Sequence, residues 1–493
     1  MGLNIDRDHF EEDDYARFSQ RLREDMRALA ELLSRERFGV GAPSLGAELE
    51  MSMVGANCRP RPINERVLAD TCDPRFTVEL NRFNLECNTL PVALARTPFS
   101  SLGKQLEECL MRLRAIASAH DARIALTGIL PTLTAEDLES SAMTNLPRYR
   151  ALSSGIRRLR GGEPFHVRID GEDPLDIHCD DVTYEGANTS LQIHLRVNRS
   201  QFAAVYNAVQ LATAPALAVS VNSPTFLGHR LWQETRVALF KQAVDDRPPN
   251  HGPRRGVPRV CFGRGWLKDG ALELFEESVE LHEPLLPVMS DEDPVAVTRA
   301  CGIPLLAELR LHQGTVWRWN RAVYDPAEGG HLRIEMRALP SGPTVADMMA
   351  SAAFLVGLAL ELSRSPALFD SVPFEVAEGN FYRAAQHGLA AELLWPQQGN
   401  ELLAIGAREL VHELLPVAQR GLLHAEIDAG ECERWLEIIE RRATTGQTGA
   451  QWQRSRLAAL EDKLGRKEAL ARMLGEYLDH SELGAPVHTW PIP

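Results

Sequence analysis

The segment GAELEMSMV, residues 46–54, decides the fold of this chain, because it has the pattern of a strand with carboxylates on one face. Glu48 and Glu50 are two residues apart, so on a strand both side chains point to the same side of the sheet. Two neighbouring carboxylates repel each other unless they are protonated or share a cation. An isolated pair of this kind is more often a solvent-facing strand edge, so the decision rests on the other segments.

A second segment, FTVELNRFNLECN (residues 76–88), carries two more carboxylates among apolar residues. Glu79 and Glu86 are seven residues apart, and a bulge or turn near 81–84 would bring both to one side of a sheet. Burying an unpaired carboxylate costs on the order of several kcal/mol or more. A small set of hard divalent cations is therefore the best candidate partner.

Two further segments alternate between polar and apolar residues, as half-buried strands do. LQIHLRV (residues 191–197) places Gln192, His194 and Arg196 on one face. A histidine on such a face is more often hydrogen-bonded and structural, and a ligand role is about as plausible beside so many carboxylates.

In RIEMR (residues 333–337), Arg333, Glu335 and Arg337 share a face. The carboxylate can hold a cation while the guanidinium binds phosphate oxygens with two parallel hydrogen bonds. The alternative is a surface salt-bridge ladder, which is worth about 0–1 kcal/mol.

The composition is that of a globular protein: 493 residues, 44% hydrophobic, 25% charged and a net charge of -15. Nucleic-acid binding normally needs a basic face, so the charge argues against it. The eight cysteines include no CxxC pair, and the N-terminal residues are unlike a signal peptide, which predicts reduced thiols in the cytoplasm. Cys87 is interpreted as a small buried hydrophobe, and no segment reads as a membrane span.

Periodicity and turn residues predict an α+β protein without internal repeats, in which an antiparallel sheet carries the site and helices cover one face. Helices are expected at 14–37, 102–120 and 201–219, and almost throughout from 345 onward (390–395 included). Strands are expected at 165–170 and 189–197, paired across the turn 171–174, and at 261–267 and around 315–325, which leads to the segment 331–343. A loop is expected at 222–228 and a lid at 247–259. The expected division is an N-terminal helical segment (1–40), a catalytic domain (41–390) and a helical C-terminal region (391–493).

Taken in order, GAELE, the segment ending in NLECNTLP, PRYRAL, TSLQIHL, NSP, two arginines eleven residues apart and IEMR resemble the glutamate–cysteine ligase family, including its bacterial carboxylate–amine ligase branch. The resemblance runs from about residue 46 to 388, and on through TGQTGAQWQ at 445–453. It implies a glutamine-synthetase-like antiparallel sheet and an ATP-dependent reaction that joins a carboxylate to an amine. Glutamate with cysteine is the implied default pair, and another amino acid or amine remains open.

The resemblance also implies roles for particular residues. Two or three Mg2+ ions, with Mn2+ as a substitute, and ATP would be bound at the metal positions Glu48, Glu50, Glu79, Glu86, His194 and Glu335. Arg337 would contact the transferred phosphoryl group, and Arg236 would act in catalysis. Substrate binding would fall to Arg236, Arg247, Arg148, Tyr149 and Gln192, with Gln192 an alternative to His194 in the metal shell. Asn380 and Arg383 match family segments without an assigned role.

The implied partners are small amino acids or amines, without nucleic acid or membrane; a homo-oligomer is possible. The alternative is a non-catalytic relative that binds nucleotide or amino acid and acts as a regulatory protein. All the expected acidic and arginine positions are filled, which favours the enzyme.

Overall fold

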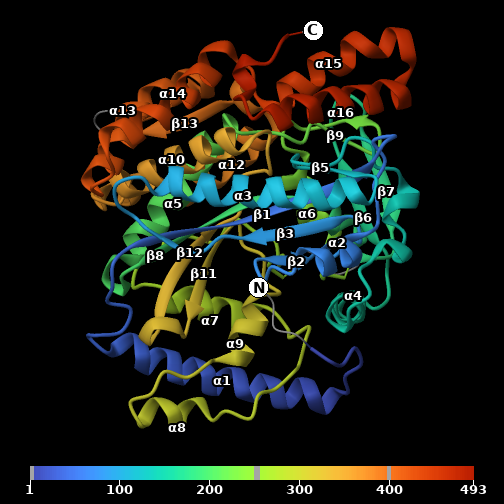
Figure 1. Ribbon diagram of the computed structural model, residues 1–493. Coiled ribbons are helices and arrows are strands. Elements are labelled where there is room, and N and C mark those ends of the chain that lie inside the picture. The colour runs from blue at the N-terminus through green and yellow to red at the C-terminus, as the bar shows by residue number, and fades with distance from the viewer. Residues whose placement is uncertain (1–4, 249–255, 397–400, 493) are drawn as a thin grey trace.

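The structure is a computed structural model of the chain, and it describes residues 5–248, 256–396 and 401–492. Its centre is an eight-stranded sheet in the order β11–β12–β8–β1–β3–β2, with β4 and β5 paired to the two ends of β1 (Figure 1). All of these pairings are antiparallel. The sheet strands are β1 (Ser44–Gly55), β2 (Phe76–Val78), β3 (Asn84–Asn88), β4 (Val92–Ala93), β5 (Ala122–Ala125), β8 (Leu191–Val197), β11 (Asn320–Asp325) and β12 (His331–Met336).

The two faces of the sheet differ, as the alternation in β1 predicts. Leu45, Ala47 and Leu49 are fully buried on one face, while Glu48 and Glu50 belong to the other. Helix α3 (Pro98–Ala119) packs on β1 and β5, and α5 (Phe202–Ala218) packs on β11. Helix α10 (Val345–Leu362) lies against both α3 and α5. The apolar face is therefore covered by helices, and the polar face is left for chemistry.

Helix α10 is the one helix among the described residues that is long and apolar enough to cross a membrane, and 78% of it is buried inside the protein. Besides α3 and α5, it packs against α13 (Ala407–His424) and α14 (Ala429–Thr445). A helix that is apolar all round and enclosed by other helices is a core helix of the fold.

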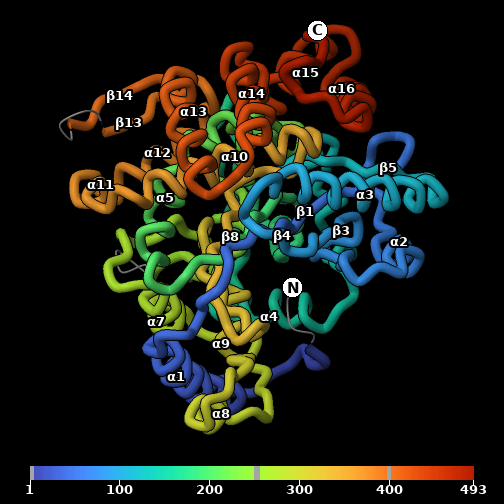
Figure 2. Tube along the Cα trace, turned by 60° about the vertical axis from the view of Figure 1, so that its left-hand side comes forward, coloured from blue at the N-terminus to red at the C-terminus, as the bar shows by residue number. Residues whose placement is uncertain are grey.

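Helices also gather at the two ends of the molecule (Figure 2). At one end, α1 (Glu12–Ser34) packs on α7 (Leu272–Leu281), α8 (Pro294–Arg299) and α9 (Ala307–Gln313). At the other end, α13 and α14 lie near α15 (Gly449–Leu464) and α16 (Arg466–Leu483). The remaining helices and strands are α2 (Asn64–Thr71), α4 (Pro147–Leu159), α6 (Thr235–Ala243), α11 (Ala367–Ser371), α12 (Phe374–His387), β6 (Phe165–Ile169), β7 (Leu175–Cys179), β9 (Thr225–Phe226), β10 (His229–Arg230), β13 (Glu392–Pro396) and β14 (Leu402–Gly406).

Three expectations about elements are wrong. The partner of β6 is β7, not the strand at 189–197, because the turn at 171–174 closes a short hairpin on a strand that the sequence reading missed. Residues 261–267 form no strand; Cys261 makes only an isolated bridge to Arg318. The segment 390–395, expected to be helical, includes most of β13, which pairs with β14. The division at residues 40 and 390 stays a prediction.

Candidate active site

The register of the sheet brings the predicted carboxylates together on its polar face. Glu48 on β1 lies opposite Gln192 on β8, and Glu50 lies opposite Glu86 on β3. On the next pair, Glu335 on β12 lies opposite His194. Because directly opposed residues share a face, residues almost 290 positions apart in the sequence meet over four neighbouring strands.

Glu48, His194 and Glu335 form a compact group whose ligand atoms all lie within 4.8 Å of one another. The His194 Nε2 atom lies 3.0 Å from Glu48 Oε1 and 3.9 Å from Glu335 Oε1. Neither ring nitrogen makes a well-aligned hydrogen bond among the described residues, although His194 is only 5% exposed. Buried polar atoms are normally hydrogen-bonded, so a ring nitrogen of His194 is available to bind a metal ion.

Burial raises the pKa of the Glu48 and Glu335 carboxyls, but charged neighbours lower both pKa values by more. The charge of His194 lowers the pKa of Glu48 to about 2. For Glu335, the guanidinium groups of Arg321 and Arg337 hold the pKa well below its usual range. Both side chains are therefore ionised at neutral pH and able to bind a cation.

A second group of carboxylates lacks such compensation. Burial, together with the charges of Glu86 and Glu50, raises the pKa of Glu79 well above its usual value. The pKa of Glu86 rises to about 7 through burial and the charges of Glu48 and Glu50. The Glu185 carboxyl, which sequence reasoning missed, has a pKa of about 8 from burial and the charge of Glu50.

This donor set fits hard divalent cations. It consists of carboxylate oxygens and one imidazole, crowded so closely that several carboxylates resist ionisation without positive charge beside them. Mg2+ prefers oxygen ligands and tolerates few protein donors per ion. Residues Glu48, Glu50, Glu79, Glu86, His194 and Glu335 could therefore hold the ions that the sequence implied, with Glu185 at the edge of the group.

Glu50 and Arg337 are joined through Gln192. The Gln192 Nε2 atom donates to Glu50 Oε1 at 2.7 Å, and its Oε1 accepts from Arg337 Nη1 at 2.6 Å. Glu50 also accepts from the backbone N–H and hydroxyl of Ser190 at 2.7 and 3.0 Å. These contacts fix the orientation of the glutamine amide and hence the position of the guanidinium.

Glu335 binds two arginines, and only one of them was predicted. Arg337 Nη1 donates to its Oε1 at 2.9 Å. From β11, Arg321 makes a two-pronged contact, with Nε at 2.5 Å from Oε2 and Nη2 at 3.0 Å from Oε1. The sequence signal for Arg321 was its place in the strand-like segment around 315–325, but its partner depends on the hairpin register, which pairs it with Glu335.

Arg236 on α6 is almost fully buried, at 2% exposed, and its guanidinium is engaged by the protein. Its Nε donates to Glu234 Oε1 at 3.0 Å, and its terminal nitrogens donate to the backbone carbonyls of Arg337 (3.4 Å) and Ala338. The side chain therefore lies against the segment that follows β12 and holds its backbone. It is close to the site, and it supports Arg337.

Arg247 lies on the segment after α6, and its guanidinium forms a two-pronged contact with Asp245 at 2.7 Å for both bonds. Its Nη1 also donates to the Gly256 carbonyl at 3.2 Å. The expected lid at 247–259 falls partly outside the described residues, because 249–255 are not among them. The lid and a substrate contact of Arg247 both stay predictions.

Four other predicted residues lie on helices α4 and α12. On α4, Tyr149 donates from its hydroxyl to the Val78 carbonyl at 3.1 Å, so it anchors the strand end that precedes Glu79. Arg148, next to it on α4, lies near Gly314. On α12, Asn380 exchanges two hydrogen bonds with the backbone of Leu394 and accepts from Arg383. Asn380 therefore ties α12 to β13, which is a structural role.

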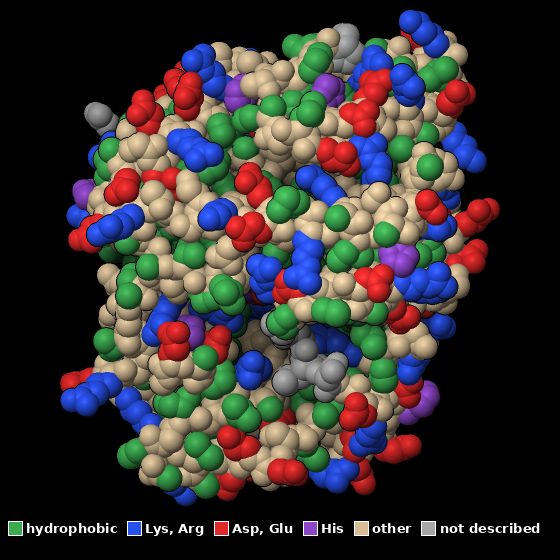
Figure 3. Space-filling model, viewed as in Figure 1, with side chains coloured by type: hydrophobic (Ala, Val, Ile, Leu, Met, Phe, Trp, Pro, Cys, Tyr) green, Lys and Arg blue, Asp and Glu red, His purple; other side chains and the backbone are tan. Residues whose placement is uncertain are grey.

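The surface over this region has mixed charge. Acidic and basic side chains are interspersed over the face in Figure 3, which is hollowed near its centre, between α1 and α3.

Cys87 is fully buried, as expected for a packing residue.

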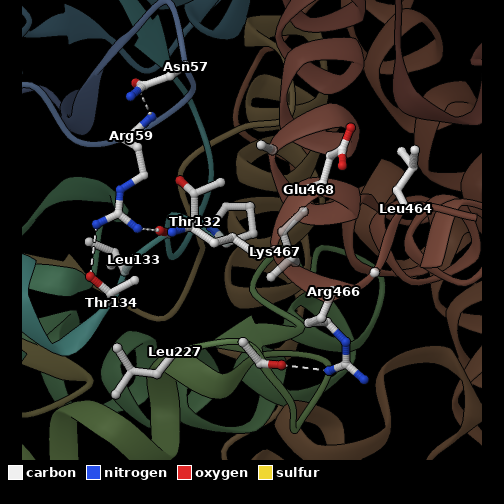
Figure 4. Close-up of a pocket in the computed structure, with 15 residues that line it drawn as sticks. Asn57, Arg59, Thr132, Leu133, Thr134, Leu227, Leu464, Arg466, Lys467 and Glu468 are labelled. Atoms are coloured by element: carbon white, nitrogen blue, oxygen red, sulfur yellow. Dashed lines mark hydrogen bonds between the residues drawn. The ribbon is translucent and has the colours of Figure 1, made fainter.

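A separate cavity of about 900 Å³ lies at the start of α16, among Arg59, residues 131–134, Leu227 and Lys467 (Figure 4). Its lining includes none of the predicted site residues. Two of the basic side chains there have partners within the protein. Arg59 binds Asp137, and Arg466 binds Asp173 and Glu461.

Comparisons with known proteins identify the family and the fold of this chain. The family described as glutamate–cysteine ligase family 2 (GCS2) matches residues 44–474. A solved structure of glutamate–cysteine ligase from Francisella tularensis in complex with AMP is similar at 13% identity and a TM-score of 0.56, covering 92% of this chain and 91% of that one. A bifunctional glutathione synthetase from Pasteurella multocida has 11% identity and a TM-score of 0.48, over 93% of this chain and 54% of that one. A sequence search of curated proteins gave no match.

The fold and the match together define the class of this protein as a glutamate–cysteine-ligase-like enzyme with a glutamine-synthetase-like α+β fold. The chain belongs to glutamate–cysteine ligase family 2, since the family match spans most of its length. The resemblance found in the sequence is confirmed at the level of family and fold.

Proposed function

We propose that this protein is an ATP-dependent carboxylate–amine ligase that activates its acid as an acyl-phosphate. The favoured acid is glutamate, reacting at its γ-carboxylate, and the favoured acceptor is cysteine or another amino acid or amine. The observation that carries the proposal is the convergence of five predicted carboxylates, His194 and Arg337 on one face of the sheet. The family match supports it.

The reaction explains why the site needs so much positive charge. A carboxylate oxygen attacks the terminal phosphorus of ATP, which releases ADP and leaves an acyl-phosphate. The amine nitrogen then attacks the carbonyl carbon, expels phosphate, gives up its proton and forms the amide. Phosphoryl transfer needs aligned reactants and cations that absorb the spreading charge. The second step needs exclusion of water until the amine arrives.

Magnesium ions held by Glu48, Glu50, Glu79, Glu86, His194 and Glu335 would neutralise phosphate charge at this site. Arg337 is suited to the transferred phosphoryl group, since its Nε has no hydrogen-bond partner among the described residues and its Nη1 is fixed by Gln192 and Glu335. A guanidinium held in this way needs no reorganisation when charge develops. Arg236 contributes by binding the backbone of Arg337 and Ala338.

A product screen tests the proposal. The protein is incubated with ATP, Mg2+ and amino acids in pairs, with glutamate and cysteine first, and products are found by mass spectrometry beside ADP release. We expect an amide product formed in equal amount with ADP. Bound ATP without turnover on any pair would favour the regulatory relative instead.

A matched pair of variants links turnover to the site. Glu50 accepts from the N–H and hydroxyl of Ser190, and Glu431 accepts from the same two groups of Ser100 at 2.7 and 2.5 Å. Glu50→Gln should abolish product, whereas Glu431→Gln should keep it. Equal activity of both variants would remove Glu50 from the proposed site. Cytoplasmic location and oligomeric state stay predictions.

A further inference from the structure

The β6–β7 hairpin carries a cluster of three metal-ligating side chains away from the central sheet. His166 and His178 lie directly opposite each other, and Asp176 lies on the same face, opposite Arg168. Their ligand atoms all lie within 4.8 Å of one another. All three residues are exposed, while Phe165 and the other alternating residues of β6 are buried.

The geometry of the cluster is already close to that of a binding site. The two imidazole rings are stacked with their centroids 4.5 Å apart and their planes 3° apart. The His166 Nε2 atom lies 2.8 Å from Asp176 Oδ1. Ligand atoms at about 2.0–2.1 Å from a zinc ion are roughly 3.3 Å from each other. The ligand atoms here lie within 4.8 Å of one another, so rotation of the exposed side chains toward a common point would bring them to that spacing. The strands beneath them need not move.

We propose that His166, Asp176 and His178 bind a borderline transition-metal ion of the Zn2+ type, separately from the Mg2+ site. Two imidazoles and one carboxylate suit Zn2+, Cu2+ or Ni2+ rather than Mg2+, which prefers oxygen ligands. Three protein ligands leave room for water at the remaining position. Arg168 on the same face opposes a cation, so the affinity depends on the two imidazoles outweighing its charge.

The ion would join the two strands of the hairpin at their exposed face, whereas the other face of β6 is already anchored by the buried Phe165, Val167 and Ile169. An isolated two-stranded hairpin is marginally stable; β6 packs against α6, and the Arg168 N–H donates to Gln242 on that helix. After β7 the chain runs into η3 (Val182–Ala187), which carries Glu185. A metal ion that joins β6 to β7 would therefore lie between α6, which carries Arg236, and η3, which carries Glu185.

The competing explanation is a solvent-exposed His–Asp pair that binds no ion. The chain supplies a control for it: His120 Nε2 lies 2.7 Å from Asp70 Oδ2, and among the described residues this pair belongs to no group of three metal-ligating side chains. If an ion pair alone attracted Zn2+, both places would behave alike.

The test titrates tag-free, full-length protein with Zn2+ in competition with a chromophoric chelator, in excess Mg2+. The parent protein and the variants share the carboxylate site, so any Zn2+ bound there cancels in the comparison. We expect a Zn2+-binding step that is lost, or weakened about tenfold or more, in His166→Gln and in His178→Gln but retained in His120→Gln. Cu2+ electron paramagnetic resonance should show two bound imidazole nitrogens in the parent protein and one in each hairpin variant. Equal Zn2+ binding by parent and hairpin variants, or no two-nitrogen Cu2+ signal, would overturn the proposal.

Discussion

Gln192 donates a hydrogen bond of 2.7 Å to Glu50, and this contact turns its carbonyl oxygen toward Arg337. A single neutral amide thereby separates an anion from a cation on one face of the sheet. Without it, the carboxylate and the guanidinium would each lose a hydrogen bond that fixes their positions.

We expect Gln192→Ala to lower turnover by about ten- to a hundredfold, because hydrogen bonds to charged groups are worth about 1.5–3 kcal/mol. The KM for ATP should change much less, since the loss is in positioning rather than in contact with the nucleotide. Steady-state kinetics with varied ATP measures both. An unchanged kcat would show that the bridge does not position Arg337.

Glu335→Gln should remove activity, because one carboxylate orients Arg321 and Arg337 and belongs to the group around His194. Glutamine is the right substitution, since it keeps the side-chain volume and one acceptor oxygen, whereas alanine would remove every contact that Arg321 and Arg337 make with this side chain. The control is Glu308→Gln, a glutamate that is equally buried and accepts from Ser290. Loss of activity in both variants, with both still folded, would point to a general effect.

Mg2+ should raise the thermal unfolding temperature, because it binds the folded state and relieves the crowding that raises the pKa of Glu79 and Glu86. Glu86→Gln removes one of the repelling charges. It should therefore raise the unfolding temperature of the metal-free protein and reduce the shift that Mg2+ produces. Scanning calorimetry with Mg2+ or a chelator tests this, and identical shifts in parent and variant would contradict it.

Asp25 on α1 predicts a pH dependence of stability that is independent of catalysis. The side chain is fully buried. Burial and the charge of Glu308 raise its pKa to about 7, although the hydrogen bond that it accepts from the Leu309 N–H acts in the opposite direction. Because the folded pKa exceeds the unfolded value of 3.8, folding takes up a proton between these pH values. The contribution to stability is complete below about pH 4 and falls as pH rises toward 7.

The unfolding free energy of Asp25→Asn should therefore rise relative to that of the parent protein by about 1.4 kcal/mol for each pH unit over this range. Chemical denaturation at pH 5, 6 and 7 measures the difference in unfolding free energy. Asp13→Asn, an exposed position on the same helix, should show no such trend. A difference that stays constant with pH would contradict the assignment.

Local pattern was enough to predict much of this fold. The alternation in GAELE, LQIHLRV and RIEMR identified β1, β8 and β12, and helical periodicity identified α1, α3 and α5. The β6–β7 pairing was missed because β7 is a five-residue strand between turns, where its polar face reads as loop.

The residues of the candidate site were likewise predictable only where the local sequence pattern identified them. Carboxylates on strands were visible because charge on an apolar strand is costly. Arg321 and Glu185 were not visible, since their place depends on the β11–β12 register and on the 3-10 helix η3. Conversely, the internal partners of Arg236 could be read only from the folded chain.

Activation of the acid by phosphoryl transfer at this carboxylate site can be followed through the oxygen atoms of the acid. The most direct measurement uses the acid found in the product screen, labelled with 18O in both oxygens of the reacting carboxylate. Transfer through an acyl-phosphate predicts one 18O atom in the released phosphate for each amide formed, in the parent protein and in the Glu431→Gln control. Phosphate without 18O, formed together with the amide, would contradict the account.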